Sequence, residues 1–354
     1  MHVNIDLADI SNGCLLAAVI LYALGMLAYA CDFAFAKQRL LAAIAPAKVP
    51  ELAAVGATAG SGVAGGGPAG SAAAGSGGAA AGPAQPALPA VVPAQQGRWP
   101  DSYWLRAAFG LTCIGLLAQV IAITTRGLSE DRVPWGNMYE FIAAFTCMAV
   151  LVLVAASVRF RAYYIGLFVL IPVVLALALD VTFVYTPAGA LVPALQSYWI
   201  AIHVTAMIVA IGLYIVGAVV TVMYLIADRH ERRVAAGLPS RVGGIMAQLP
   251  RPVVLDRLSY RSILFAFPVW TFGVMAGAIW ADHAWGRYWG WDPKETWSFI
   301  TWVVYACFLH ARATAGWRGR KAAYIQLAGF GCLLFNVIGI NLWVAGLHSY
   351  AGLG

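Results

Sequence analysis

Residues 197–227 read SYWIAIHVTAMIVAIGLYIVGAVVTVMYLIA and contain no Asp, Glu, Lys or Arg. A helix needs about 20 apolar residues to cross the hydrocarbon core of a bilayer, so this segment is long enough to span a membrane. Further apolar runs lie near residues 12–35, 103–125, 138–158, 162–180, 262–280, 296–315 and 322–345. We therefore predict an all-α polytopic integral membrane protein with about eight transmembrane helices.

The composition excludes a soluble enzyme held by a single membrane anchor. Of the 354 residues, 62% are hydrophobic and only 10% are charged, whereas soluble domains carry about 25% charged residues. The six cysteines all lie inside apolar runs, which is typical of small buried side chains rather than of disulfides or thiolate metal sites. The sequence also contains no P-loop, no glycine-rich dinucleotide turn, no HExxH motif and no Cys-x-x-Cys-His motif.

The basic residues predict the orientation of the chain. Lys and Arg outnumber Asp and Glu by 22 to 15, and short loops rich in Lys and Arg stay on the cytoplasmic side. If the N-terminus lies outside, all but four of the 22 fall on the cytoplasmic side; the four outside are Arg126, Arg132, Arg287 and Lys294. Both termini are therefore expected outside. This orientation explains the net charge of +7 without a nucleic-acid partner.

Residues 52–97 hold no charged residue and consist mostly of Ala, Gly, Pro and Ser. Such a segment buries too little apolar surface to offset the entropy lost on ordering it. We therefore expect a first transmembrane helix within residues 1–44, a disordered cytoplasmic linker over 45–100, and a seven-helix membrane domain over 101–354.

The loop between the spans 262–280 and 296–315 is rich in tryptophan, because six of the 13 tryptophans fall between residues 280 and 302. Trp is common at membrane interfaces, but an interfacial belt spreads over many helix ends and does not require the Asp-Pro-Lys-Glu sequence found here. Trp289 and Trp291 bracket one glycine, a spacing that places both rings on one side of an extended segment. Flat indoles beside charges of both signs suit a large planar ligand with acidic groups. We therefore predict a binding loop over residues 280–297.

The same loop contains a helix start. Asp292 is a preferred N-cap residue, Pro293 suits the first helical position, and Glu295 falls in the first turn. A second polar segment precedes the span 138–158. Glu140 in this segment either pairs with an outer arginine or favours the N-terminus of the helix.

Two of the six histidines are predicted on the same face as the tryptophan-rich loop. His203 lies one or two turns inside the outer end of the span 197–227, and His348 lies just beyond the outer end of the span 322–345. Two neutral imidazoles beside an aromatic platform are what axial ligation of a haem iron requires. Polar residues at the membrane interface are the alternative, and the residues alone leave both interpretations open.

His310 and His283 are two further candidates. His310 follows Trp297 by 13 residues, hence by roughly 20 Å along a helix, which puts it in the inner half of the bilayer. An ionisable residue at that depth indicates a functional site, although a helix–helix hydrogen bond is the alternative. His283, inside the tryptophan-rich loop, is either an extra ligand or an exposed interfacial residue.

Residues 285–297 read WGRYWGWDPKETW and strongly resemble the WWD motif of haem-handling proteins in cytochrome c biogenesis. Within that superfamily the chain is similar to the CcsA family, the System II subunit that works with a CcsB partner. The likeness extends to His203, His310, residues 137–140 and residues 346–350. It covers roughly residues 100–354 and the first span. One departure is Asp282-His283, which stands where the family pattern has Asn-Glu, and this leaves open what replaces that Glu.

The resemblance implies that the chain is the haem-handling subunit of a cytochrome c synthase. It implies that the loop holds haem b non-covalently at the outer face, with His203 and His348 as axial ligands. His310 would belong to an inner haem site whose second ligand comes from the CcsB-type partner. The other residues expected at the haem site are Trp285, Trp289, Trp291, Asp292, Trp297, Arg287 and Lys294. Arg287 and Lys294 either pair with the haem propionates or anchor the loop at the interface.

The resemblance further implies a multi-pass protein of the bacterial inner membrane, with its active face in the periplasm. There the haem is presented to the Cys-x-x-Cys-His thiols of an apocytochrome c. One alternative is a haem chaperone or exporter without synthase activity. Another is a bis-His membrane cytochrome b, which expects paired histidines at both depths, whereas only His310 is predicted in the inner half. A secondary transporter leaves the tryptophan cluster unexplained.

Overall fold

A computed structural model of the chain describes residues 3–44, 102–189, 191, 195–239 and 249–348, the side chains of 36–44 excepted. Over these residues the chain is helical and contains no strand. The long helices are α1 (Ile5–Ile44), α2 (Tyr103–Glu130), α3 (Met138–Phe160), α4 (Gly166–Leu179), α5 (Tyr198–Ala235), α7 (Pro252–Trp285), α8 (Pro293–Ala313) and α9 (Arg320–Leu334). The short elements are the 3-10 turn η1 (Tyr163–Ile165), the π-helical turns η2 (Asp180–Val184) and η4 (Phe335–Gly339), and α10 (Ile340–Trp343). The linker expected over 45–100 lies outside the described residues.

Seven segments among the described residues are long and apolar enough to cross a membrane. They lie in α1, α2, α3, α5 and α7 and in the stretches Tyr163–Val184 and Arg320–Trp343. The eighth expected span, 296–315, corresponds to α8, which packs on α9 and α7 but is less apolar than these seven. Large apolar side chains such as Leu117, Leu175 and Phe265 are exposed on the outside of the bundle, where lipid tails would surround them. The chain is therefore a multi-pass membrane protein.

Three details differ from the sequence prediction. The apolar run 162–180 is followed by η2, because Asp180 at its end is fully buried and the helix continues past it. Helix α5 runs on to Ala235, so the first basic residues after Ala227 are helical rather than part of a loop. All six thiols are free, as expected, but they are only partly buried, and Cys307 is exposed.

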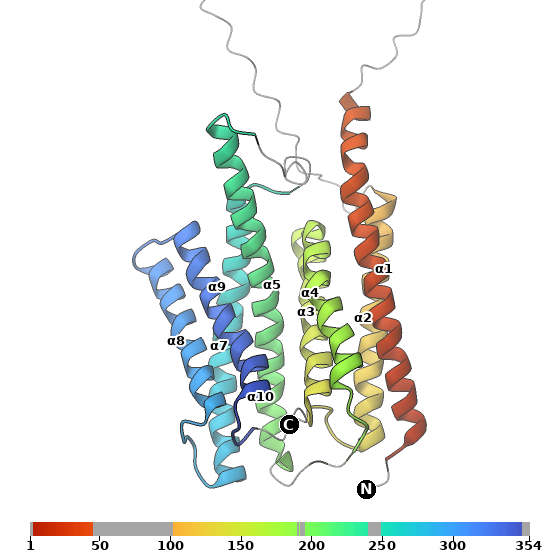
Figure 1. Cartoon of the computed structure of the whole chain (residues 1–354), viewed down its shortest axis with the longest axis vertical. Helices are drawn as coiled ribbons and strands as arrows, with labels where there is room; N and C mark the ends of the chain where they lie inside the picture. Colours follow the sequence, from red (N-terminus) through yellow and green to blue (C-terminus); the bar gives the residue numbers. More distant parts are fainter. Residues whose placement is uncertain (1–2, 45–101, 190, 192–194, 240–248, 349–354) are drawn as a thin grey trace, which may run out of the picture. The chain divides into compact units, whose positions relative to one another are not determined.

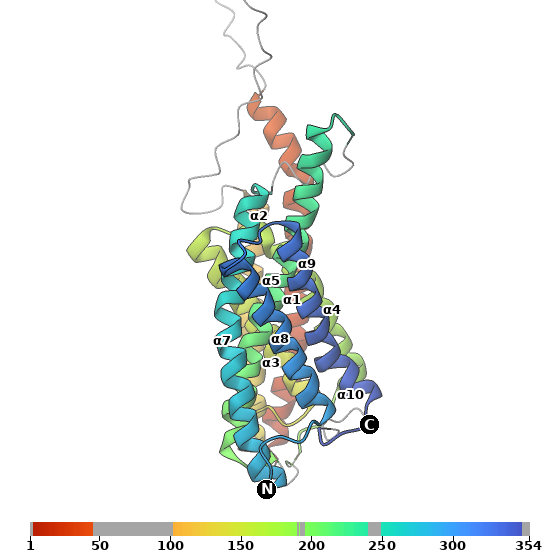
Figure 2. The same cartoon turned by 90° about the vertical axis from the view of Figure 1, so that its left-hand side faces the viewer.

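Helix α5 is the central element of the bundle. In its most apolar stretch 72% of the residues are buried, against 28–50% in the other membrane-spanning segments. It packs on α7, α3 and α9 (Figure 1), and α7, α8 and α9 together form one side of the bundle (Figure 2). Tyr214 of α5 stacks on Tyr305 of α8 with ring centroids 4.1 Å apart, and its edge meets Trp270 of α7. Any side chain on the inner face of α5 is therefore surrounded by several helices.

A buried cluster of four charges holds the segment between α2 and α3. Glu140 accepts hydrogen bonds from Arg126 Nε (3.2 Å) and from Arg132 Nη1 (3.0 Å). Glu130 completes the cluster, with its carboxylate 3.3 Å from Arg126 and 2.6 Å from Arg132. All four side chains are at most 9% exposed, and their formal charges cancel. Of the two roles predicted for Glu140, the pairing with arginine is therefore confirmed.

The cluster also sets the entry to α3. The backbone N–H of Gly136 donates to Glu140 Oε2 at 2.8 Å, and the Asn137 side chain accepts the N–H of Glu140 as the N-cap. The segment before α3, which includes Trp135, is thereby tied to the ion cluster. This matters because Trp135 contributes to the cavity described below.

Replacing Glu140 by Ala should destabilise the protein by about 3–5 kcal/mol, because two buried guanidinium groups lose a carboxylate. The matched control is Asp228→Ala, which breaks the pair with Arg232, a side chain that is 64% exposed; this change should stay within about 0.5 kcal/mol. Thermal unfolding in detergent measures both variants. Equal unfolding temperatures for the two variants would contradict a stabilising role of the buried cluster.

Candidate functional site

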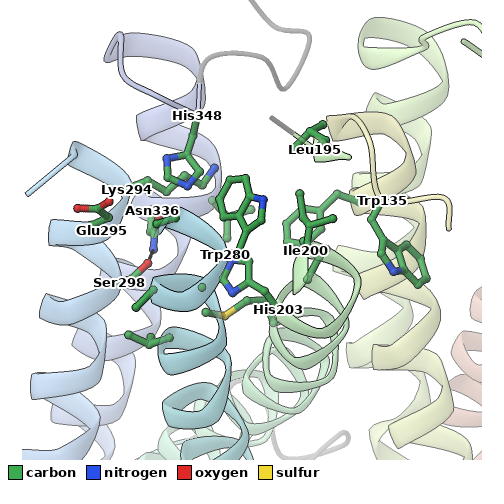
Figure 3. A pocket seen from close by; sticks show the side chains of 18 of the residues that line it. Trp135, Leu195, Ile200, His203, Trp280, Lys294, Glu295, Ser298, Asn336 and His348 are labelled. Carbon is green, nitrogen blue, oxygen red and sulfur yellow. Dashed lines mark hydrogen bonds between the residues drawn. The ribbon is translucent and has the colours of Figure 1, made fainter. Parts of the chain in front are cut away.

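A large cavity lies near the end of the bundle where α7, α8 and α10 meet their loops (Figure 3). It encloses about 1080 Å³ of space between the atoms, a figure that includes the part open to solvent. Its walls come from α3, α5, α7, α8 and η4, and most of the lining side chains are apolar or aromatic. A few polar residues, among them His203, His348 and Lys294, also face it. The lining of the cavity is therefore of the character that binds a mostly apolar ligand with a few polar groups.

His203 belongs to α5, and its imidazole packs against α7. Its Nδ1 lies 2.8 Å from the carbonyl oxygen of Gly273. Because a carbonyl oxygen can only accept a hydrogen bond, Nδ1 carries a hydrogen and donates this bond. A Cβ on Gly277 would lie 2.7 Å from the imidazole, so only glycine leaves room for the ring. The two glycines, four residues apart on α7, let the helices approach closely. With Nδ1 engaged, Nε2 is the nitrogen that a metal would meet.

His348 is held in a similar way from the opposite side of the cavity. Its Nδ1 lies 2.9 Å from Oδ2 of Asp292, whose other oxygen accepts the backbone N–H of Leu347 at 2.8 Å. Burial alone raises the pKa of Asp292, but the hydrogen bonds from His348, from Leu347 and from the backbone of Lys294 lower it to about 2. The carboxylate is therefore ionised at neutral pH. A carboxylate on Nδ1 orients Nε2 of a metal-binding histidine.

Asp292 has a second task at the start of α8. Its side chain accepts the backbone N–H of Lys294, while Glu295 accepts the backbone N–H of Asp292, which together form a capping box with Pro293 in the first turn. The helix start predicted from the sequence is confirmed. The same carboxylate therefore caps α8 and holds His348.

The indole of Trp280 contacts both histidines (Figure 3). It stacks on His203 with an interplanar angle of 8° and ring centroids 6.0 Å apart, and its centroid is 5.8 Å from that of His348. Trp285 contacts both Trp280, at 4.8 Å, and His348, at 5.2 Å. The structure thus gathers both predicted ligand histidines and the first tryptophan of the motif around one buried ring.

Trp289 and Trp291 differ in their placement. Trp289 lines the cavity, whereas Trp291 does not and is 65% exposed. The expected extended segment is absent because Trp291 has φ of 58°, in the left-handed region that non-glycine residues rarely adopt. The two rings nevertheless touch edge to face at 5.8 Å. The left-handed residue turns the chain between the loop and the cap of α8.

The two basic residues of the loop, Lys294 and Arg287, lie in different surroundings. The Nζ of Lys294 donates to the amide oxygen of Asn341 at 2.6 Å, and this lysine lines the cavity. Arg287 does not line it, because its guanidinium packs against Gly290, where a Cβ would overlap Nη1. Beside Lys294 the cavity wall carries two buried oxygens without a hydrogen-bond partner, Oδ1 of Asn336 and Oε1 of Glu295. Of these groups, only the Lys294 ammonium can therefore interact favourably with an acidic group of a ligand, because the two unpaired oxygens are hydrogen-bond acceptors.

Comparison with known proteins places this site in a family. The model of the cytochrome C assembly protein family matches residues 135–348. The chain is 35% identical over 310 residues to the cytochrome c biogenesis protein CcsA of Gloeobacter violaceus, covering 71% of this chain and 91% of that protein. It is 33% identical over 279 residues to the CcsA of Guillardia theta, with the same two coverages.

The chain belongs to the CcsA family. The residues that the family model matches begin at Trp135 and end at His348, and both of these residues line the cavity. A further CcsA, from Chlamydomonas reinhardtii, is 45% identical over 163 residues, which cover 46% of this chain and 43% of that protein.

The remaining predicted residues lie outside the cavity of this CcsA family member. His310 is exposed in the last turn of α8, at the opposite end of the helix from Asp292. His283 is exposed, with Nδ1 3.0 Å from the carbonyl of Ile279. Trp297 packs on Phe335, with ring centroids 4.3 Å apart. No group of three or more His, Cys, Asp or Glu side chains in the described part of the chain is arranged to hold a metal ion.

Sequence reasoning missed Gly277, and it included Trp280 only as the first residue of the predicted loop 280–297, without a role at the site. Both lie on α7, three residues apart, so they share one face of the helix and meet His203 together. The spacing of Gly273 and Gly277 inside an apolar span is a signal for close helix packing that was available in the sequence. The position of the Trp280 ring is a result of tertiary packing.

A Gly277→Ala substitution should displace His203 and destabilise the protein by about 1–3 kcal/mol, because the new methyl group overlaps the imidazole. The control is Gly110→Ala in α2, where a Cβ meets nothing within 4 Å; its stability should be unchanged or slightly raised. Thermal unfolding compares the two variants. A Gly277→Ala protein as stable as the Gly110→Ala protein would show that α7 does not confine the imidazole.

Proposed function

We propose that this CcsA family member holds haem b non-covalently in the cavity, with His203 and His348 as axial ligands, and presents it for attachment to apocytochrome c. As a cytochrome c assembly protein, the chain takes part in cytochrome c maturation. One observation carries the proposal for the site. Two imidazoles face one apolar cavity, and each has its Nδ1 held by an oxygen of the protein. Both rings are thereby prepared to offer Nε2 to an iron atom.

The lining of the cavity fits a haem. The apolar and aromatic walls suit a porphyrin ring, and Trp285 and Trp289 supply flat surfaces for it. Lys294 pairs with a propionate, because its ammonium faces the cavity and donates to an uncharged amide. Arg287 serves better as an anchor of the loop, since it packs on Gly290 instead.

The other residues of the motif act from outside the cavity. Asp292 acts by holding His348 and capping α8. Trp297 braces α8 against Phe335. Trp291 offers an exposed ring beside the loop, at the place where an apocytochrome would approach.

Attachment requires little chemistry from the chain itself. Haem supplies two vinyl groups, and the two thiols of the Cys-x-x-Cys-His segment add across them. In each addition a carbon–sulfur bond forms and the hydrogen goes to the other vinyl carbon, so there is no leaving group and no net oxidation. The chain contributes position: its histidines hold the iron, its aromatic walls hold the ring, and one histidine gives way to that of the apocytochrome.

We further propose that a CcsB-type partner covers the exposed face of α8. This face carries Val303, Cys307 and His310, all of them exposed. An exposed histidine in a membrane-embedded helix needs a polar partner, and an inner haem bound by His310 and one partner histidine would supply it. The distribution of basic residues favours the bacterial inner membrane topology in which the haem cavity faces the periplasm.

Adding haemin to the purified wild-type protein should give the absorption spectrum of a bis-histidine haem. His203→Ala and His348→Ala should each abolish that spectrum and lower haem affinity by at least the roughly 10–100-fold that loss of an outer-shell partner costs. His283→Ala is the matched control, because this histidine is close in sequence but exposed and outside the cavity. The assignment of the ligands fails if the two alanine variants keep the wild-type spectrum, or if only His283→Ala loses it.

Co-expression with a CcsB-type partner and an apocytochrome c distinguishes a synthase subunit from a haem chaperone. We expect thioether-bound cytochrome only with the wild-type chain, and almost none with His348→Ala. His310→Ala should lower the yield because it impairs supply from the inner side, while the protein loaded with haemin in vitro keeps the outer bis-histidine spectrum. Cytochrome formation that does not depend on this chain would favour the chaperone.

A further inference from the structure

Glu295 carries a carboxylate oxygen that no group in the described part of the chain engages. Its Oε2 accepts the backbone N–H groups of Gly290, at 2.8 Å, and of Asp292, at 3.0 Å, so this one oxygen completes the capping box of α8. Its Oε1 is buried and has no hydrogen-bond partner. A buried acceptor without a partner is costly in a folded protein and calls for an explanation. The capping of α8 explains Oε2 but not Oε1.

The position of Glu295 joins the cavity to the outer loop. The side chain lines the cavity that His203 and His348 also line (Figure 3). At the same time it is hydrogen-bonded to Gly290, which is exposed in the tryptophan-rich loop, and the next residue, Trp291, is 65% exposed. A peptide that approaches this loop therefore reaches the carboxylate where the loop meets the cavity.

Three charged residues are packed around Glu295, and the groups of each are engaged elsewhere. They are Lys294, Arg287 and Asp292. The Nζ of Lys294 donates to the amide of Asn341, the guanidinium of Arg287 packs on the loop backbone, and the carboxylate of Asp292 holds the segment after α10. Two backbone hydrogen bonds thus fix the Glu295 carboxylate in place, while its Oε1 is available to a group that carries a proton.

The addition of a thiol to a vinyl group needs such a proton acceptor. The thiolate, not the thiol, is the nucleophile, and a free cysteine with a pKa of about 8.5 is only a few per cent ionised at pH 7. A base within hydrogen-bond reach of the thiol removes this limit, because it takes the proton while the new bond forms.

We propose that Glu295 is the general base for the addition of an apocytochrome thiol to a vinyl group of haem, an inference that rests on the proposed function. Its Oε1 takes the proton of the S–H bond while the sulfur electron pair forms the carbon–sulfur bond to one vinyl carbon and the vinyl π bond opens. The proton then passes to the other vinyl carbon, which restores the carboxylate. The product keeps every atom of the thiol and the vinyl group, so the step needs no oxidant, reductant or leaving group. Glu295 is thus a catalytic residue, whereas Asp292, which acts through His348, is a positioning residue.

Glu295→Gln separates the two roles of the side chain. Glutamine also serves in capping boxes, so the variant should keep the unfolding temperature and the bis-histidine haem spectrum of the wild type. It cannot take a proton, and a general base contributes about 10²–10⁴-fold to a rate. Thioether formation at pH 7 should therefore slow by at least about 100-fold. The matched control is Asp282→Asn, since Asp282 is a carboxylate at the end of α7 that does not line the cavity; it should react like the wild type.

The measurement uses the purified complex of the full-length chain and its CcsB-type partner in detergent. The complex is loaded with haem and mixed with a synthetic peptide that contains Cys-x-x-Cys-His, and haem bound covalently to the peptide is followed over time at pH 7 and at pH 9. The rate of Glu295→Gln should rise by about 20-fold between these two pH values, because the ionised thiol no longer needs a base. The wild-type rate should change little. A merely structural defect would not be rescued by pH.

A wild-type rate of Glu295→Gln at pH 7 overturns the inference, and so does a defect that stays the same at pH 9 or that Asp282→Asn shares. If Glu295→Gln does not fold, the wild type decides alone: a nearly constant rate between pH 7 and pH 9 supports the base, and a rise of about 20-fold shows that only the free thiolate reacts and overturns it. Failure of the proposed function is a separate result, in which the wild type shows no bis-histidine spectrum or attaches no haem to the peptide, and both proposals then fall.

Discussion

The close approach of α5 and α7 at Gly273 and Gly277 is the constraint on which the site depends. It leaves space for one imidazole, and the carbonyl oxygen of Gly273 at the edge of that space accepts a hydrogen bond from Nδ1 of His203. A side chain at Gly277 would displace the ring, whereas a Cβ at Gly273 would lie 3.1 Å from the flexible end of Met207. Because α5 is the most buried of the membrane-spanning helices, its neighbours in the bundle fix the position of the His203 ring. The rest of the site is built from helix ends around this ring.

The other half of the site rests on one carboxylate. Asp292 ends the tryptophan-rich loop, caps α8 and holds both the backbone of Leu347 and the ring of His348. The start of one helix and the segment after α10, far apart in the chain, thereby become one structural unit. The two histidines are held in different ways. His203 lies between two packed helices, α5 and α7. His348 lies in the segment after α10, which the Asp292 carboxylate holds through hydrogen bonds from the Leu347 backbone and the His348 ring. In the proposed function, the His348 side is therefore the one better suited to give up its place to the histidine of an apocytochrome.

Much of this architecture was predictable from the sequence, because the bilayer imposes simple rules. The length of the apolar runs predicted the spans, and cap preferences predicted the start of α8 at Pro293. For Glu140 the sequence left two roles open, of which pairing with arginine was one. The failures concern tertiary placement. A spacing of two residues predicts a shared side only in an extended chain, and Trp291 is left-handed. Lys294 and Arg287 are indistinguishable as sequence features, yet only Lys294, in the first turn of α8, faces the cavity. The ring of Trp280 contacts both histidines because three elements converge there, which no local pattern contains.

A structure of this protein with haem bound tests the central claim most directly. The account predicts the iron between Nε2 of His203 and Nε2 of His348, with the Nδ1 contacts to Gly273 and Asp292 kept. Haem bound elsewhere, or bound through other side chains, would contradict the account.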